Sequence, residues 1–499
     1  MLTDLIAAAA EADDARPTDR GTIKLGGIDP LGLRQINFEL MDLVLPGLNN
    51  VTRHIRPYVV MAWAWRRAHR LVAARKGASA DAADLRDFVD RIETIFVWSQ
   101  FLKDGDADLP GGQALRDLLL GKAYDFGGKE WDDRRALRAY STGLIAALNY
   151  GPSLRSMGWL LPLAGRDDLF APPIELDPLL DDFEARLGPA LRHKAFNQFG
   201  PVRVKRSDAK AWAGLWTHDE PEEIESAYMF ERLGGAAAPP ARQRGVALLQ
   251  AAYTDLGEEE PEDGALRRRM ADLAAAWNNP SLRPATADIW RRVQIRQLFR
   301  LALEGYFHWI VGKLIQQGSM TSEALALTFL AELPKRRQGS STAGVWLKGR
   351  RTRLNPVDLL EQLAAALAGA GSLTAAIIDA LAAALAEAPD EPEPFESVDR
   401  LPLAKAKRDT DAWANFSRAE FLVRIIERWI MAQHAYWAVG RGLAEARSRS
   451  ETRRLRLKIV MDEGGWTLTP GVTKQGAPPE ATPDRLRTAY FLLWECDQL

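Results

Sequence analysis

The chain has 499 residues, of which 47% are hydrophobic and 26% charged, with 65 basic and 67 acidic side chains. This composition excludes a disordered chain and a generally basic one, and the length predicts about two to four domains. The single cysteine, Cys496, excludes an intramolecular disulfide framework and a thiolate-rich metal site. Because the start resembles no secretory signal and no apolar run reaches about 20 residues, we expect a soluble, cytoplasmic protein without a membrane partner.

The N-terminal half predicts a series of helices. Asp29-Pro30 combines a capping side chain with a proline at the first helical position, and Pro57 similarly opens a helix to about residue 74. A broad apolar face predicts another helix from residue 81 to about 102. After Gly200, the alternation in 202–206 indicates a short strand or extended loop.

The C-terminal half starts with a long helical pattern from Thr286 to about Gln317. Asn355-Pro356 caps the next helix, and glycines near residue 370 turn the chain into an alanine-rich partner, so we expect a helical hairpin there. A helix over about 415–447, two strands around the glycine turn in 455–469 and a last helix follow. This order is compatible with a winged-helix-like unit.

The predicted fold class is therefore mainly α, with multidomain helical bundles and a small β-hairpin near the C-terminus. Linker-like segments set the expected domain boundaries. They divide the chain into an N-terminal tail (1–20), an N-terminal helical domain (21–166), a middle helical region with a short extended segment (167–264), a helical domain with a basic loop at 334–355 (265–389), an acidic linker (390–402) and a C-terminal helix-hairpin-helix unit (403–499).

Charge is segregated along the sequence although the whole chain is nearly neutral. No Asp or Glu lies between Asp42 and Asp81, and none lies between residues 334 and 357, while both windows are rich in arginine. Local positive charge attracts polyanions. For Arg66, Arg67 and Arg70 of the first window, the polar face of an amphipathic helix is the favoured interpretation.

The second window is compatible with a nucleic-acid contact or with a solvated connector between two helices, and we carry the nucleic-acid contact forward as the prediction. Its cations are mixed with glycines, hydroxyls and a tryptophan that could stack on a base. An arginine stripe at four-residue steps in the long helix and a cluster leading into the C-terminal hairpin would assist it. The expected nucleic-acid-binding residues are Lys335, Arg336, Arg337, Trp346, Lys348, Arg350, Arg351, Arg353, Arg292, Arg296, Arg300, Arg453, Arg454 and Arg456.

We find no signature of catalysis, of a cofactor or of a bound metal. The six histidines have none of the spacings that fix zinc or iron, and the chain contains no Walker A loop, GxGxxG turn or GxSxG elbow. A metal-dependent nuclease remains an alternative, since Asp462 and Glu463 beside Lys458 have suitable chemistry. A solvent-exposed hairpin turn explains Asp462-Glu-Gly-Gly465 better.

The N-terminal region resembles a known group of proteins. Ile28-Asp-Pro-Leu-Gly32, Leu45-Pro-Gly-Leu-Asn-Asn-Val-Thr-Arg53, and Arg56-Pro-Tyr58 followed by Trp63 are similar to the N-terminal signature of uncharacterised bacterial proteins found in anti-phage defence loci. The resemblance covers about residues 23–70. It implies a role beside partner proteins of the same operon, such as an ATPase or a nuclease, and carries over no catalytic residue.

These observations together predict a non-catalytic subunit of a bacterial defence assembly that binds nucleic acid, with DNA as the expected form, and partner proteins. Two alternatives stay open, a metal-dependent nuclease and a protein-only scaffold whose basic segments meet an acidic partner.

Overall fold

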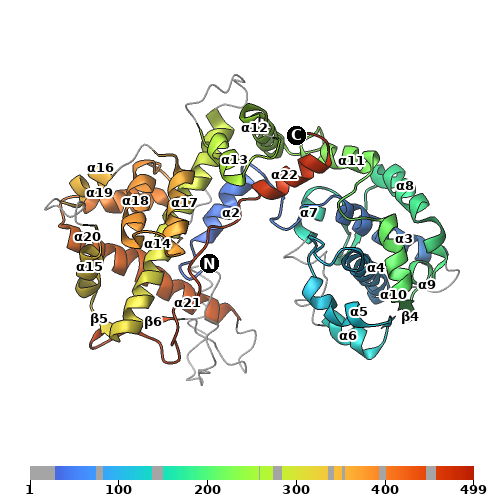
Figure 1. Ribbon diagram of the computed structural model, residues 1–499, viewed down its shortest axis with the longest axis horizontal. Coiled ribbons are helices and arrows are strands. Elements are labelled where there is room, and N and C mark those ends of the chain that lie inside the picture. Colours follow the sequence, from blue (N-terminus) through green and yellow to red (C-terminus); the bar gives the residue numbers. More distant parts are fainter. Residues whose placement is uncertain are drawn as a thin grey trace. The chain divides into compact units, whose positions relative to one another are not determined.

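The computed structural model describes residues 29–74, 82–136, 150–257, 259–272, 284–334, 342–350, 354–392, 400–445 and 457–499 (Figure 1). The chain folds into two compact units. Unit 1 comprises residues 1–41 and 267–482, and unit 2 comprises residues 42–266 and 483–499. The chain therefore passes between the units three times.

Unit 1 is built mainly from helices. Its elements in chain order are α2 (Arg34–Asp42), the end of α13 (Asp263–Met270), α14 (Pro284–Gln317), β5 (Ser319–Met320), α15 (Ser322–Ala331), α16 (Ala343–Arg350), α17 (Pro356–Leu367), α18 (Leu373–Ala386), α19 (Leu403–Ala412), α20 (Arg418–Arg424), a π-helical stretch (Ile425–Met431), α21 (Ala432–Glu445), β6 (Ile459–Asp462) and β7 (Gly465–Leu468).

The core of unit 1 forms around α14, the long helix predicted from residue 286 onward. Helices α17 and α18 pack against α14 and against each other, so the predicted helical hairpin is confirmed (Figure 1). The Asn355 side chain caps α17 by accepting from the Val357 amide at 3.0 Å. Gly369 and Gly371 supply the positive φ angles of the turn, which other residues adopt only with strain.

The predicted C-terminal hairpin is also present. Strands β6 and β7 pair antiparallel with Asp462 opposite Gly465, and β5 pairs with the other edge of β7. The Asp462 carboxylate accepts from the Gly464 amide at 2.9 Å, the bond expected of an Asp in a tight turn. The favoured interpretation of Asp462-Glu-Gly-Gly465 as a turn therefore agrees with this geometry.

Unit 2 holds shorter elements and two small sheets. Its elements are the start of α13, α3 (Arg56–Ala74), α4 (Ala82–Lys103), η1 (Gly112–Leu115), α5 (Arg116–Leu120), β1 (Ala123–Phe126), α6 (Lys129–Ala136), α7 (Gly151–Ser156), β2 (Leu161–Leu163), β3 (Arg166–Ala171), η3 (Ile174–Leu176), α8 (Asp177–Leu187), η4 (Gly188–Arg192), α9 (Lys194–Asn197), β4 (Val202–Lys205), α10 (Arg206–Trp212), η5 (Ala213–Leu215), α11 (Glu223–Leu233), α12 (Pro240–Leu256) and α22 (Leu486–Glu495).

Helices α3 and α4 form the centre of unit 2. They pack against each other, and α3 also contacts α8 and β3. Trp63 and Phe183 meet edge to face with ring centroids 5.6 Å apart, an arrangement that adds to the free energy gained by burying both rings. Strand β1 pairs with β4, and β2 with β3, in both cases antiparallel.

The mainly helical fold with a small C-terminal hairpin is confirmed. The two compact units, however, differ from the domains that the linker-like segments predict. The hairpin β6–β7 belongs to unit 1, and the last helix, α22, belongs to unit 2. A winged-helix unit would need both in one compact body. The order helix, hairpin, helix therefore does not form such a unit here.

Helix α12 of unit 2 packs closely against the backbone of Val44 at Gly245. A Cβ added at this position of α12 would overlap the backbone carbonyl of Val44. We expect Gly245→Ala to lower the free energy of unfolding by about 1–3 kcal/mol, because overpacking outweighs the gain in helix propensity of about 1 kcal/mol. Urea denaturation followed by circular dichroism measures this change in the free energy of unfolding.

The matched control is Gly349→Ala on α16, where the added methyl group would meet no atom within 4 Å. That variant should be at least as stable as the wild type. A Gly245→Ala protein of unchanged stability would contradict the close approach of α12 to residue 44.

Candidate functional site

Many of the predicted nucleic-acid-binding residues lie outside the part of the chain that the structure describes. They are Lys335, Arg336, Arg337, Arg351, Arg353, Arg453, Arg454 and Arg456. For these residues the expectation stays a prediction.

The prediction that the arginines of α14 form an exposed basic stripe is wrong. Arg296 is fully buried and donates to the backbone oxygens of Leu401 at 2.8 Å and Arg400 at 3.1 Å. Arg300 is also buried and pairs with Glu304 at 2.6 Å. The Arg300 guanidinium also donates to the Glu480 carbonyl at 2.7 Å, so both guanidinium groups join α14 to other segments of unit 1, since a buried cation needs such partners.

Arg292, the first member of the stripe, lies nearer the surface. Its guanidinium pairs with Asp288 one turn earlier at 3.2 Å, and its side chain is 32% exposed. The three arginines therefore do not form a common face for phosphate.

The second window also departs from the predicted exposed loop. Residues 343–350 form α16, and Trp346 on this helix is 5% exposed and belongs to the core of unit 1. Base stacking by Trp346 is therefore excluded by its burial. Arg350 pairs with Asp379 at 2.7 Å, while Lys348 is exposed.

Arg66, Arg67 and Arg70 of the first window are paired with carboxylates of α8, which agrees with the favoured helix-face interpretation. Arg66 contacts Asp181 at 2.9 Å, and Arg67 contacts Glu184 at 2.9 Å. Arg70 reaches Asp181 at 3.2 Å. These carboxylates lie more than 100 residues later in the chain, so folding pairs this part of the acid-free window with acidic side chains of α8.

An exposed group of cations does occur on unit 2. We call it the basic surface and define it as Lys122, Lys205, Arg206 and Lys210. Strand β4 buries Val202 and Val204 and exposes the residues between and after them, because side chains alternate along a strand. The β1–β4 register places Lys205 opposite Ala123, next to Lys122.

The basic surface continues directly into α10. The Arg206 amide donates to the Lys122 carbonyl at 2.9 Å, which holds the two residues side by side. Lys210 follows Arg206 at a four-residue step on α10, and such residues share a helix face. All four side chains of the basic surface are exposed. Figure 1 shows β4 leading into α10 near the strand label.

Little negative charge accompanies these four cations. Within the described ranges none of them forms an ion pair, whereas the neighbouring Arg203 pairs with Asp125 at 2.7 Å. Asp208 on α10 is half-buried and lies close to the Ser207 hydroxyl at 3.3 Å. The basic surface therefore presents positive charge that its surroundings do not cancel, the condition for attracting a polyanion.

Sequence reasoning missed the basic surface although a signal for it existed. The alternation Val202, Arg203, Val204, Lys205 indicates a short strand or an extended loop, and the structure has the strand β4 there. The same alternation places the basic residues outward. Because this run is short compared with the two acid-free windows, its basic residues do not stand out in the sequence.

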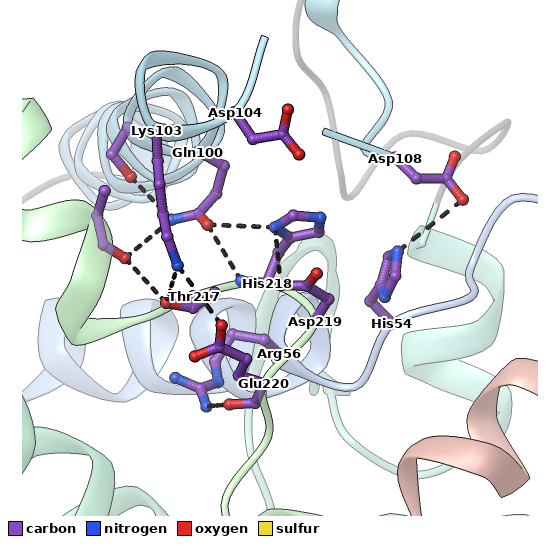
Figure 2. Close-up of polar contacts among 12 residues, drawn as sticks. His54, Arg56, Gln100, Lys103, Asp104, Asp108, Thr217, His218, Asp219 and Glu220 are labelled. Atoms are coloured by element: carbon purple, nitrogen blue, oxygen red, sulfur yellow. Dashed lines mark hydrogen bonds and ion pairs between the residues drawn. The ribbon is translucent and has the colours of Figure 1, made fainter. Parts of the chain in front are cut away.

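A second polar centre of unit 2 is formed by two histidines from distant parts of the chain (Figure 2). His54 precedes α3, and His218 lies in the loop between η5 and α11. Their rings meet edge to face with centroids 4.9 Å apart. Both side chains are buried, at 8% and 5% exposed.

Hydrogen bonds determine which ring nitrogen carries the proton in each neutral histidine. The Glu495 carboxylate on α22 contacts His54 Nδ1 at 2.5 Å and accepts from the Ile55 amide at 2.8 Å. Gln100 Oε1 accepts from the His218 backbone amide at 3.1 Å and lies 3.2 Å from His218 Nδ1. Because both acceptors are oxygens, each Nδ1 donates and each Nε2 carries the lone pair.

The surroundings of the histidine pair are mostly acidic. His54 Nε2 has no hydrogen-bond partner among the described residues and points toward Asp108, whose Oδ2 is 3.9 Å away (Figure 2). His218 Nδ1 lies 3.6 Å from Asp219. Burial lowers the pKa of His218, with Asp219 opposing that shift and His54 adding to it.

The described residues contain no group of three histidine, cysteine, aspartate or glutamate side chains arranged to hold a metal ion. In the same part of the chain, no helix combines the length and apolar character needed to cross a bilayer. Searches against protein-family models, curated proteins and solved structures found no match to this chain.

Proposed function

We propose that the protein binds nucleic acid through the basic surface of unit 2, gripping the phosphate backbone without catalysing a reaction. The observation that carries the proposal is the cluster of four exposed cations just before β1, on β4 and on α10 that no described carboxylate neutralises. Lysine and arginine contacts to phosphate supply most sequence-independent affinity for DNA.

The basic surface favours backbone contact over base recognition. Lys122 immediately precedes β1, Lys205 lies on the paired strand β4, and Arg206 and Lys210 follow on the adjoining helix, so the charges extend over several elements. Phe126, Val202 and Val204, the apolar strand residues near them, are buried and cannot stack on a base. We therefore expect binding that is insensitive to sequence and strongly sensitive to salt.

Neutralising part of the basic surface should weaken DNA binding. Arg206→Gln with Lys210→Gln removes two phosphate contacts, and we expect the affinity for a DNA duplex at about 0.1 M salt to fall about tenfold. Fluorescence anisotropy of a labelled duplex measures the change. Both side chains are exposed, so the double variant should fold normally.

The matched control is Arg244→Gln with Lys474→Gln. These two residues are exposed and form no ion pair within the described ranges. Equal weakening by both double variants would show that net charge, rather than this surface, determines affinity. Undetectable DNA binding by the wild type would favour the protein-only scaffold, and cleavage of DNA with added magnesium or manganese would favour the nuclease.

The resemblance of residues 28–63 to proteins of anti-phage defence loci supports a second part of the proposal. We infer that the protein acts as a subunit beside partners encoded in the same operon, such as an ATPase or a nuclease. The nucleic-acid contact would then position the substrate for the partner.

A further inference from the structure

The histidine pair joins three elements of unit 2 that are far apart in the sequence. His54 immediately precedes α3, Glu495 on α22 contacts its Nδ1, and His218 comes from the loop 216–222. That loop is tied down by further contacts. Its Glu220 carbonyl accepts from Arg56 at 2.5 Å, and Thr217 Oγ1 accepts from Lys103 at 3.0 Å.

The geometry limits how many protons the pair can hold. Each Nδ1 already donates a hydrogen bond, so a proton can add only at Nε2 of either ring. With ring centroids 4.9 Å apart and both side chains buried, two imidazolium ions would repel each other strongly. The folded arrangement therefore accepts one proton far more readily than two.

The charged groups around the pair are unevenly distributed. On the His54 side stand Glu495 and Asp108, and Arg53 offsets the latter with an ion pair of 2.9 Å. The exposed fraction of the Asp108 side chain, 61%, allows water to screen its contribution.

On the His218 side stand three carboxylates and one cation. Asp219, Asp104 and Asp108 favour a charged ring, while Lys103 lies close by and contacts Glu220 at 3.7 Å. Despite the carboxylates, burial dominates and lowers the pKa of His218, so this ring stays neutral at neutral pH.

We propose that the His54–His218 pair is an acid-sensitive latch, which holds the loop 216–222 against the start of α3 while it carries at most one proton and releases the loop when it takes up a second. Opening lets His218 enter water, where its charge is solvated and separated from His54. It also removes the Glu220 carbonyl from the Arg56 guanidinium.

The sign of the pH dependence follows from the pKa of His218. A base whose pKa is lower in the closed state binds fewer protons there than in the open state. Closure is therefore favoured fully above about pH 6.5, the ordinary value for histidine, and is progressively lost below it.

Hydrogen exchange followed by mass spectrometry tests the latch on the full chain. At pH 5.0 relative to pH 7.5, after correction for the intrinsic exchange rate, amides of 216–222 should exchange at least tenfold faster in the wild type. Amides of α12 should keep their protection, which separates loop opening from unfolding of unit 2. The His218→Gln variant takes up no proton and should keep its loop closed at both values.

The control is His193→Gln, which changes a histidine outside the pair and should open like the wild type. Unchanged exchange in the wild-type loop, or equal acceleration in His218→Gln, would overturn the latch. If His218→Gln is already open at pH 7.5, His54→Gln decides, because it removes the repulsion between the two rings and should reduce the acceleration, while burial of His218 retains part of it. An acceleration in that variant as large as in the wild type would also overturn the proposal.

Discussion

Replacing Arg300 by methionine is expected to lower the free energy of unfolding by about 3–5 kcal/mol, the range found when one partner of a buried ion pair is removed. Arg300 and Glu304 are both 0% exposed and pair at 2.6 Å. The Arg300 guanidinium also donates to the Glu480 carbonyl at 2.7 Å. Methionine would leave the Glu304 carboxylate with only the longer contact to Arg34 at 3.8 Å, and burial already raises the pKa of Glu304 against the opposing effect of Arg300.

Urea denaturation of the single and double variants measures this effect. Arg300→Met combined with Glu304→Leu removes both charges, so it should be clearly more stable than Arg300→Met alone. The control is Arg408→Met, which breaks an exposed pair with Glu391 at 3.9 Å and should change stability by about 0.5 kcal/mol or less. If Arg300→Met lowers the free energy of unfolding as little as Arg408→Met does, the buried ion pair does not stabilise unit 1 as we expect.

Acidification should weaken unit 1 through His434. Its Nδ1 lies 3.1 Å from the Pro30 carbonyl, and its Nε2 accepts from the Lys458 amide at 2.9 Å. Only the neutral ring can make both bonds. Burial accordingly lowers the pKa of His434 to about 4.

The unfolded chain takes up this proton near pH 6.5, whereas the folded chain resists it until about pH 4. The stability due to neutral His434 is therefore complete above pH 6.5 and is lost progressively as the pH falls toward 4. The total is about 3 kcal/mol, from roughly 1.4 kcal/mol per pKa unit.

Unfolding free energies between pH 4 and 8 test this, with a His434→Gln variant expected to lose much less stability on acidification. His69→Gln is the matched control and should follow the wild type. If His434→Gln and the wild type lose stability equally between pH 6.5 and 4, another group causes the acid sensitivity.

Local chemistry explains which parts of the fold were predictable. The cap at Asn355, the glycine turn near residue 370 and the alternation in 202–205 act over a few residues, so the sequence shows them directly. The helical hairpin and strand β4 are confirmed for this reason. The winged-helix interpretation depended instead on which distant elements pack together.

The candidate site was less predictable because charge pairing is a tertiary property. Arg66 and Arg67 have no acidic neighbour in sequence, yet α8 neutralises both. Arg296 looks exposed by its spacing and is enclosed by residues 400 and 401. His54 and His218 are 164 positions apart, so no spacing rule could have associated them.

The salt dependence of DNA binding tests the central claim most directly. Each phosphate contact contributes about 0.9 to the slope of log affinity against log salt concentration. We therefore expect a steep negative slope for the wild type, and a slope shallower by about two for Arg206→Gln with Lys210→Gln. A wild-type affinity independent of salt, or identical slopes for the two proteins, would contradict phosphate binding at the basic surface.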